Sequence, residues 1–135
     1  MAKTWGEKLL GGSPAHVSAM PKAMWGLAKG DKLFIATPVL VRDYMKKIRK
    51  GSSRTILDMR QDFAKARKAD ATCPMTASIF ARIAAEAALE DMANGKPVDK
   101  VTPFWRLIDA KSPIAKKLTC GAAFVAKMRQ KEGIG

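Results

Sequence analysis

Apolar residues recur at helical spacing over residues 40–48 and again over residues 56–68, which predicts two consecutive amphipathic helices. The first begins after Thr37-Pro38, where threonine can cap the helix and proline fills a first-turn position whose N–H would have no partner. The second begins at Thr55, which can form a capping box with Asp58. The residues expected to pack beneath the second helix are Phe63 and either Leu57 or Met59.

A third and longer helix is predicted from about Thr76 to Asn94-Gly95, which is a helix stop. Its run of alanines over residues 84–88 has high helix propensity, and these small side chains permit close packing of helices. Residues 69–74 are expected to form the connector that precedes it. The candidates for its buried face are Ile79, Phe80, Ile83, Ala84, Ala87 and Leu89.

The remaining segments carry weaker patterns. Residues 16–20 and 32–36 are candidates for short strands, and residues 101–108 are interpreted as extended. Ser112-Pro113 marks a turn, and a final helix is predicted over residues 122–131. The residues of this helix expected to point inward are Phe124, Val125 and Met128, and Gly133 is expected to end it.

Together these elements predict a helix-rich α+β fold. A chain of 135 residues, 47% of them hydrophobic, fits one domain with one core. We expect residues 1–36 to form an N-terminal arm with two short strands, a β appendage. Residues 37–135 are expected to form a helix-turn-helix domain, with the second and third predicted helices as its pair.

Positive charge is the strongest compositional signal. The chain has 25 lysine and arginine residues against 12 aspartate and glutamate residues, a net charge of +13. Domains this basic commonly bind nucleic acid, although a protein can also be basic without binding a polyanion. Several cations gather at the end of the first predicted helix, where they also complement the helix dipole: Lys46, Lys47, Arg49 and Lys50.

The sequence shows no pattern typical of a metal, cofactor or catalytic site. His16 is the only histidine, and Cys73 and Cys120 are far apart, so a zinc site of the usual kind lacks ligands. Residues at the N-terminus do not resemble a secretory signal, and no apolar run approaches the ~18 residues of a membrane span. We therefore expect a cytoplasmic, non-enzymatic protein with reduced thiols and no membrane association.

Four short segments, taken in order, point to a known family. Gly51, Thr55 and Asp58 of residues 51–58 (GSSRTILD) stand where a G-x-V-x-T-Y-G-E turn leads into a helix, and residues 73–80 (CPMTASIF) are similar to N-P-x-A-A-R-A-V. Residues 103–108 (PFWRLI) stand where P-C-H-R-V-V is found, and residues 121–133 look like a closing helix that ends in Glu-Gly. In this order they resemble the C-terminal domain of the alkylguanine-DNA alkyltransferases. The resemblance implies a winged helix-turn-helix and DNA binding.

The departures from that family change the expected function. Phe104 stands at the position of the alkyl-accepting cysteine, and Trp105 replaces the histidine that activates it, so alkyl transfer is not expected. The alkyltransferase-like branch also lacks this cysteine, which implies a protein that binds damaged DNA without reacting. Ile56 and Ser78 replace the tyrosine and arginine that assist base flipping in the family, so two flipping elements are missing.

The candidate contacts to nucleic acid combine cations with hydroxyl groups near a helix N-terminus. Thr76 and Ser78 can bind phosphate together with free N–H groups, and Arg82 lies one turn further. The structural alternatives are that Thr76 caps the helix and that Arg82 is solvated or pairs with Glu86. The predicted nucleic-acid-binding residues are Lys50, Arg54, Thr76, Ser78, Arg82 and Arg106.

Phe104 and Trp105 are also candidates for stacking on unpaired bases, because an aromatic face beside basic residues can hold a base. The alternative is that one or both rings fill the core. Alternation along an extended segment would bury one ring and expose the other.

Three functions of different classes are compatible with these patterns. The leading hypothesis is non-catalytic binding of nucleic acid, with duplex DNA as the expected partner; charge alone does not distinguish it from RNA. The second is a protein-interaction or scaffold module that has kept the fold and lost DNA contact. The third is a thiol enzyme that uses Cys73, which precedes Pro74 near a helix N-terminus, a setting that can lower the pKa of a thiol.

Overall fold

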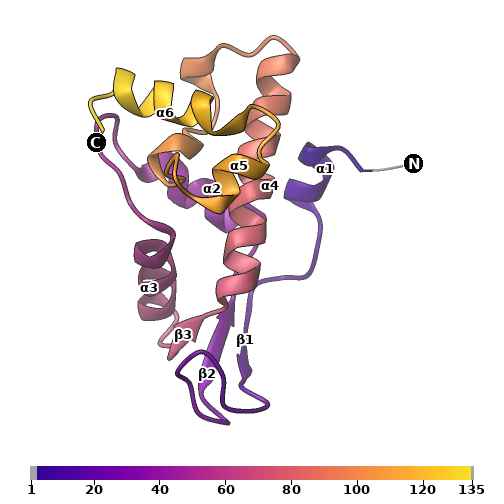
Figure 1. Cartoon of the computed structure of the whole chain (residues 1–135). Helices are drawn as coiled ribbons and strands as arrows, with labels where there is room; N and C mark the ends of the chain where they lie inside the picture. Colours follow the sequence, from indigo (N-terminus) through magenta and orange to yellow (C-terminus); the bar gives the residue numbers. More distant parts are fainter. Residues whose placement is uncertain (1–2, 135) are drawn as a thin grey trace.

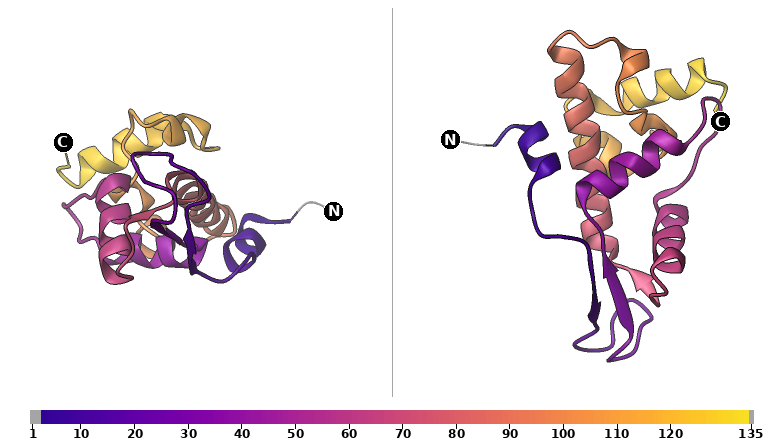
Figure 2. Two further views of the ribbon diagram at one scale, coloured as in Figure 1. Left: turned by 90° about the horizontal axis from the view of Figure 1, so that it is seen from below. Right: turned by 180° about the vertical axis from the view of Figure 1, so that it is seen from behind.

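The computed structural model describes residues 3–134 and confirms a helix-rich α+β fold (Figure 1). The long helix α4 (Pro74–Ala93) runs through the middle of the molecule. A small sheet lies at one end of α4, and the C-terminal helices lie against its other half (Figures 1 and 2). The described residues do not include residues 1 and 2, at the start of the predicted N-terminal arm, or residue 135, at the end of the predicted helix-turn-helix domain.

The chain begins with a helix that the apolar pattern did not predict, α1 (Trp5–Leu10). Its start is nevertheless visible in the sequence, because Thr4 and Glu7 form a complete capping box. The carboxylate of Glu90 on α4 accepts hydrogen bonds from the backbone N–H groups of Trp5 and Gly6, at 3.0 and 3.1 Å. These bonds use donors that are free at a helix N-terminus and so attach α1 to α4.

Both predicted strands are confirmed, as β1 (His16–Ala19) and β2 (Lys32–Ile35), which pair antiparallel. The connector before α4 contains a third strand, β3 (Ala71–Thr72), which the prediction missed and which pairs parallel with β2. Phe34 of β2 is fully buried in the main core. The N-terminal arm therefore shares its core with the rest of the chain.

The predicted helix starts are confirmed for α2 (Pro38–Lys47) and α3 (Ile56–Ala66). The side chains of Thr37 and Thr55 accept hydrogen bonds from the backbone of the first turn in each case. Helix α4 begins earlier than predicted, with Cys73 at the N-cap position, so the alternative in which Thr76 caps it is wrong.

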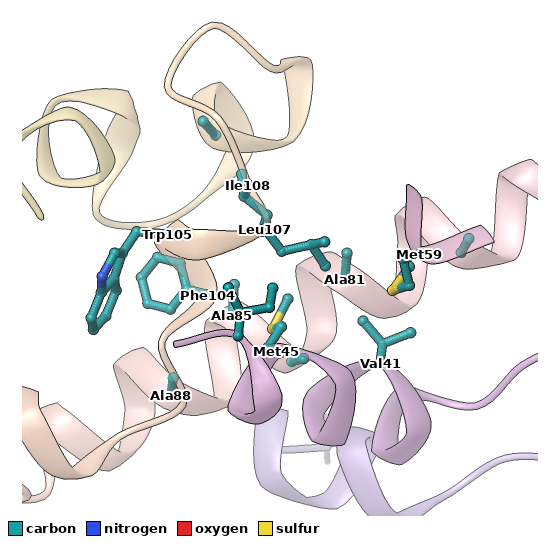
Figure 3. Packing of buried hydrophobic residues seen from close by; sticks show 14 of the residues in the cluster. Val41, Met45, Met59, Ala81, Ala85, Ala88, Phe104, Trp105, Leu107 and Ile108 are labelled. Atoms are coloured by element: carbon teal, nitrogen blue, oxygen red, sulfur yellow. The ribbon is translucent and has the colours of Figure 1, made fainter. Parts of the chain in front are cut away.

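The core is built on an alanine face of α4 (Figure 3). Val41 and Met45 of α2 point toward these alanines, and the phenyl ring of Phe104 lies beside them. On α3, Phe63 is buried as predicted, and of the two alternatives Met59 is buried and Leu57 is exposed. Ile79 is exposed, so its predicted burial is wrong. Small side chains occupy the buried face of α4 instead, because they let α2 approach closely. The buried alanines of this face are Ala77, Ala81, Ala84, Ala85 and Ala88.

The prediction of an extended segment at residues 101–108 is wrong. The segment contains one 3-10 helix, η2 (Phe104–Arg106), and a second, η1 (Val98–Lys100), precedes it. Six of its eight residues are buried, all except Pro103 and Arg106, which suits a segment enclosed by helices rather than the edge of a sheet.

The C-terminal part forms two helices, α5 (Pro113–Lys117) and α6 (Gly121–Lys131). Ser112-Pro113, predicted as a turn, is the N-cap and first residue of α5. The final helix is confirmed, with Val125 and Met128 buried and Phe124 half-buried, and Gly133 follows its end with a positive φ of 75°.

Glu86 is a buried carboxylate that joins α4 to the turn between α5 and α6. It accepts hydrogen bonds from the hydroxyl of Thr119, at 2.7 Å, and from the Thr119 backbone N–H, at 3.3 Å. We expect Glu86→Ala to lower the free energy of unfolding by about 2 kcal/mol, because it removes these acceptors and leaves a cavity. Glu86→Gln keeps an acceptor oxygen and should lose less. Urea unfolding measures both; equal losses would contradict this role.

Candidate nucleic-acid interface

The residues from the end of α2 to the start of α3 form the most basic surface segment, which we call the basic loop (residues 46–54). It contains five cations and no acidic residue, and all five cations are exposed. The loop follows the edge of the molecule near the C-terminus (Figure 1). Its cations are Lys46, Lys47, Arg49, Lys50 and Arg54.

The first cleft, of about 490 Å³, separates the basic loop from η1 and α6. Lys46 and Lys50 line it from the loop, and Lys100 and Lys131 line it from the other side. The described residues that line it include two acidic residues, Asp99 and Glu132, and Glu132 pairs with Arg106. Apart from the Arg106–Glu132 pair, four lysines and one aspartate therefore line this cleft.

Two smaller clefts, of about 360 and 240 Å³, share Ser53 and Arg54 of the basic loop. In the larger of the two, Lys47, Arg49 and Arg54 outnumber Asp62. The smaller contains Arg54 and Arg129 with Asp109. Each of the three clefts around the loop thus has an excess of positive charge, which suits an anionic ligand.

Tyr44 contributes a neutral donor to the edge of the second cleft. Its hydroxyl donates a hydrogen bond of 2.5 Å to the carboxylate of Asp62. Burial, helped by this hydrogen bond, raises the pKa of Tyr44 well above its usual value. The phenol therefore stays protonated and keeps its hydrogen bond to Asp62. Among the described residues that line this cleft, Asp62 has the only carboxylate that would repel an anion.

An ion pair holds the backbone of the basic loop in place. Arg106 Nε donates to Glu132 at 2.8 Å, and its Nη1 donates to the carbonyl of Ile48, also at 2.8 Å. Glu132 also accepts a hydrogen bond from Trp105 Nε1 at 2.8 Å and one from the Gly51 N–H at 3.3 Å. The carbonyl of Arg106 accepts from the Arg54 N–H at 2.9 Å. These contacts fix the loop at three points along its length.

The structure brings together only two of the predicted nucleic-acid-binding residues as exposed cations, Lys50 and Arg54. Arg106 lies beside them, but the prediction that it is a phosphate contact is wrong. Its side chain is only 15% exposed, and its guanidinium is committed to Glu132 and to the Ile48 carbonyl. Its role in this structure is to hold the loop.

The α4 residues predicted as phosphate contacts lie elsewhere. The guanidinium of Arg82 lies over the ring of Trp5, 5.7 Å from its centroid. Trp5 belongs to α1, which lies on the side of α4 away from the C-terminus (Figures 1 and 2). It does not pair with Glu86, which faces Thr119. Thr76 and Ser78 are half-buried near the sheet end of α4. These three residues do not form one surface with the basic loop.

The prediction that Phe104 and Trp105 offer a stacking surface is also wrong, since they are 0% and 3% exposed. Their ring centroids lie 5.2 Å apart (Figure 3). Both rings also pack against the ring of Phe124. Burial of both follows from the 3-10 turn of η2, because consecutive residues of a turn do not alternate between core and solvent as those of a strand do.

The two thiols bear on the hypothesis of a thiol enzyme, and Cys73 does lie at the N-cap position of α4. Cys73 is buried against Met20 and Leu33. Cys120 is half-buried, and burial raises the pKa of its thiol. Over residues 3–134, no cluster of three or more histidine, cysteine, aspartate or glutamate side chains could hold a metal ion. None of the described helices combines the length and apolar composition required to cross a bilayer.

Comparison with known proteins adds no assignment to this surface. No family model matches the chain, and no curated protein or solved structure is significantly similar to it. Sequence reasoning missed the contribution of Lys100 and Lys131, since no local pattern places them across a cleft from residues 46–54. The acid-free run of the basic loop is the signal that could have identified its centre.

Proposed function

We propose that this protein binds nucleic acid, with duplex DNA as the expected ligand, through the basic loop and its clefts, and that it catalyses no reaction. The observation that carries the proposal is a nine-residue segment with five exposed cations and no acid, whose backbone is fixed by Arg106 and Glu132. Cations on an ordered backbone lose less freedom on binding than those on a mobile one. Phosphate contacts of this kind supply affinity without sequence readout.

A helix-turn-helix of winged type is part of the proposal. The basic loop leads directly into α3, and α3 and α4 follow each other as the helix pair, with the β1–β2 hairpin in the place of a wing. In that arrangement the loop would contact the DNA backbone beside the pair. The connector, residues 67–73, contains β3 and is longer than the usual turn of three or four residues, so the pair would be a variant of the motif.

The absence of catalysis rests on Phe104 and Cys73. The resemblance to alkyltransferase-like proteins places Phe104 at the reactive position, and its fully buried phenyl ring has no nucleophilic atom. Cys73 is buried among apolar side chains, so little of its surface is open to a substrate. Both observations support a binding protein over an alkyl-transfer or thiol enzyme.

A protein-interaction module is the second candidate, favoured by an apolar surface on α4. Met75 and Ile79 lie one turn apart, and both expose more than half of their surface. Such a pair on one helix face is a common anchor for a partner protein. Binding of a partner at this face would leave the basic loop unused.

Fluorescence anisotropy with a labelled duplex, a single strand and an RNA of equal length tests the proposal. We expect log K for the duplex to fall linearly with log salt, with a slope of about −3 to −4 if about four phosphates are neutralised. Affinity that is undetectable at low salt, or that does not change with salt, would contradict nucleic-acid binding and favour the interaction module.

A further inference from the structure

Trp25 occupies the tip of a tight turn in the connection between β1 and β2. Met24 and Leu27 exchange backbone hydrogen bonds of 3.0 and 2.9 Å, which leaves Trp25 and Gly26 as the two central residues. Both have positive φ angles, 55° and 78°. Positive φ at both central residues is the pattern of a type I′ turn, in which asparagine and glycine are the usual residues.

A tryptophan is an unfavourable residue at this position. Its Cβ makes the left-handed conformation unfavourable, and folded proteins normally offset such a cost by packing. Trp25 is 45% exposed, and neither hydrophobic cluster of the described residues includes it. Almost half of this residue's surface is therefore left to solvent, while the backbone conformation opposes a tryptophan at this position.

The turn is presented on an ordered loop. The N–H of Met20 donates to the carbonyl of Asp31 at 2.8 Å, and the N–H of Gly30 donates to the carbonyl of Met20 at 2.9 Å. The Asp31 carboxylate accepts a bond of 2.8 Å from the N–H of Ala28. The connection between β1 and β2, which carries this turn, lies at the end of the molecule opposite the C-terminal helices (Figure 1).

The segment that carries Trp25 is basic. Lys22, Lys29 and Lys32 are all exposed, and Asp31 is the only acidic residue in positions 20–32, although the Asp70 carboxylate accepts a hydrogen bond from the Lys32 N–H at 2.7 Å. A partly exposed aromatic ring thus stands in a lysine-rich stretch of chain, a combination found in proteins that stack on unpaired bases while binding the phosphates beside them.

We propose that Trp25 stacks on an unpaired or displaced base of the bound nucleic acid, so that the protein prefers strands with bulged or single-stranded nucleotides. This inference rests on the proposed function, which supplies the bound strand. Stacking needs an exposed base face, and a continuous duplex offers one only at its ends. The preference for bulged or single-stranded nucleotides therefore comes from Trp25 in the connection between β1 and β2. The affinity for nucleic acid of any sequence comes from the basic loop.

Two variants and two DNA ligands test this inference. Trp25→Asn removes the ring and suits the left-handed backbone, and Trp25→Phe keeps an aromatic face. The ligands are a perfect duplex and the same duplex with a one-base bulge. We expect Trp25→Asn to lower affinity for the bulged duplex about tenfold, the loss expected for one stacked base, and to leave the perfect duplex nearly unchanged.

Stability and fluorescence provide independent readouts. The melting temperature of Trp25→Asn should equal or exceed that of the wild type, because asparagine tolerates this backbone conformation. The bulged duplex should quench tryptophan emission in the wild type, and Trp25→Phe should retain binding but lose this quenching. Unchanged affinity of Trp25→Asn for the bulged duplex would overturn the stacking role and leave the proposed function intact. A wild-type protein that binds neither duplex would overturn both.

Discussion

Replacing Lys50 and Arg54 together with glutamate is expected to lower the affinity for a DNA duplex about a hundredfold at low salt. Both side chains are exposed, and Arg54 lines two of the three clefts around the basic loop. Each substitution removes a phosphate contact and adds a repulsive charge, at a cost of about 1 to 2 kcal/mol per site. The slope of log K against log salt should become shallower by about two.

A matched variant separates this surface from the effect of net charge. Lys116 and Lys117 are exposed on α5, and neither lines any of the three clefts. Replacing both with glutamate makes the same change in net charge as the first double variant. We expect only a severalfold loss of affinity, from the long-range field. Equal losses for the two double variants would show that binding follows net charge rather than the basic loop.

Glu132→Ala is expected to lower the free energy of unfolding by about 3 kcal/mol, because it leaves the buried guanidinium of Arg106 without its partner. It also removes the acceptor of Trp105 Nε1 and of the Gly51 N–H. The melting temperature should fall by about 10 °C for a chain of this size. Thermal unfolding followed by circular dichroism measures the change.

Asp99→Ala is the control for this variant. Asp99 is an exposed acidic residue that lines the same cleft. Its loss should leave the melting temperature within a few degrees of the wild type, and it should slightly strengthen DNA binding. A Glu132→Ala variant as stable as Asp99→Ala would contradict the role of the Arg106–Glu132 pair in holding the loop.

The contribution of Glu132 should also depend on pH. Burial raises the pKa of Glu132, but hydrogen bonds from Arg106, Trp105 and the Gly51 N–H outweigh burial and hold the pKa below its ordinary value of 4.5. A carboxyl whose pKa is lower in the folded state stabilises the fold above that ordinary value and loses this effect as pH falls through the folded pKa. The stability difference between the wild type and Glu132→Gln should therefore be full near pH 7 and shrink below about pH 4.5.

Local signals in the sequence predicted the helix starts well. The Thr37 and Thr55 caps depend only on residues within one turn, and both form as expected. The Thr4 and Glu7 capping box of α1 was equally visible but is followed by only a short helix. Whether so short a segment is helical depends on tertiary contacts, here those of Glu90 with its first turn.

The interpretation of residues 101–108 failed because Pro103 and a short apolar run are compatible with both a strand and a compact turn. The surrounding helices decide between them, because they bury six of the eight residues. The stacking hypothesis for Phe104 and Trp105 depended on the extended conformation. It therefore failed for the same reason.

The candidate site was predictable in its centre but not in its extent. Lys50 and Arg54 belong to a run whose charge is evident from the chain itself. The partners across the first cleft, Lys100 and Lys131, are more than 40 residues away in sequence. Arg106 was predicted as a phosphate contact because nothing near it in sequence indicated a partner. Its partner, the carboxylate of Glu132, is brought to it only by folding.

Backbone amide chemical shifts of the isotopically labelled protein, recorded during titration with a DNA duplex, test the location of the interface most directly. We predict that the largest changes fall on residues 46–54, with further changes at residues 98–100 and 128–132 across the first cleft. Changes confined to the exposed face of α4 around Met75 and Ile79, or no changes at low salt, would contradict the account.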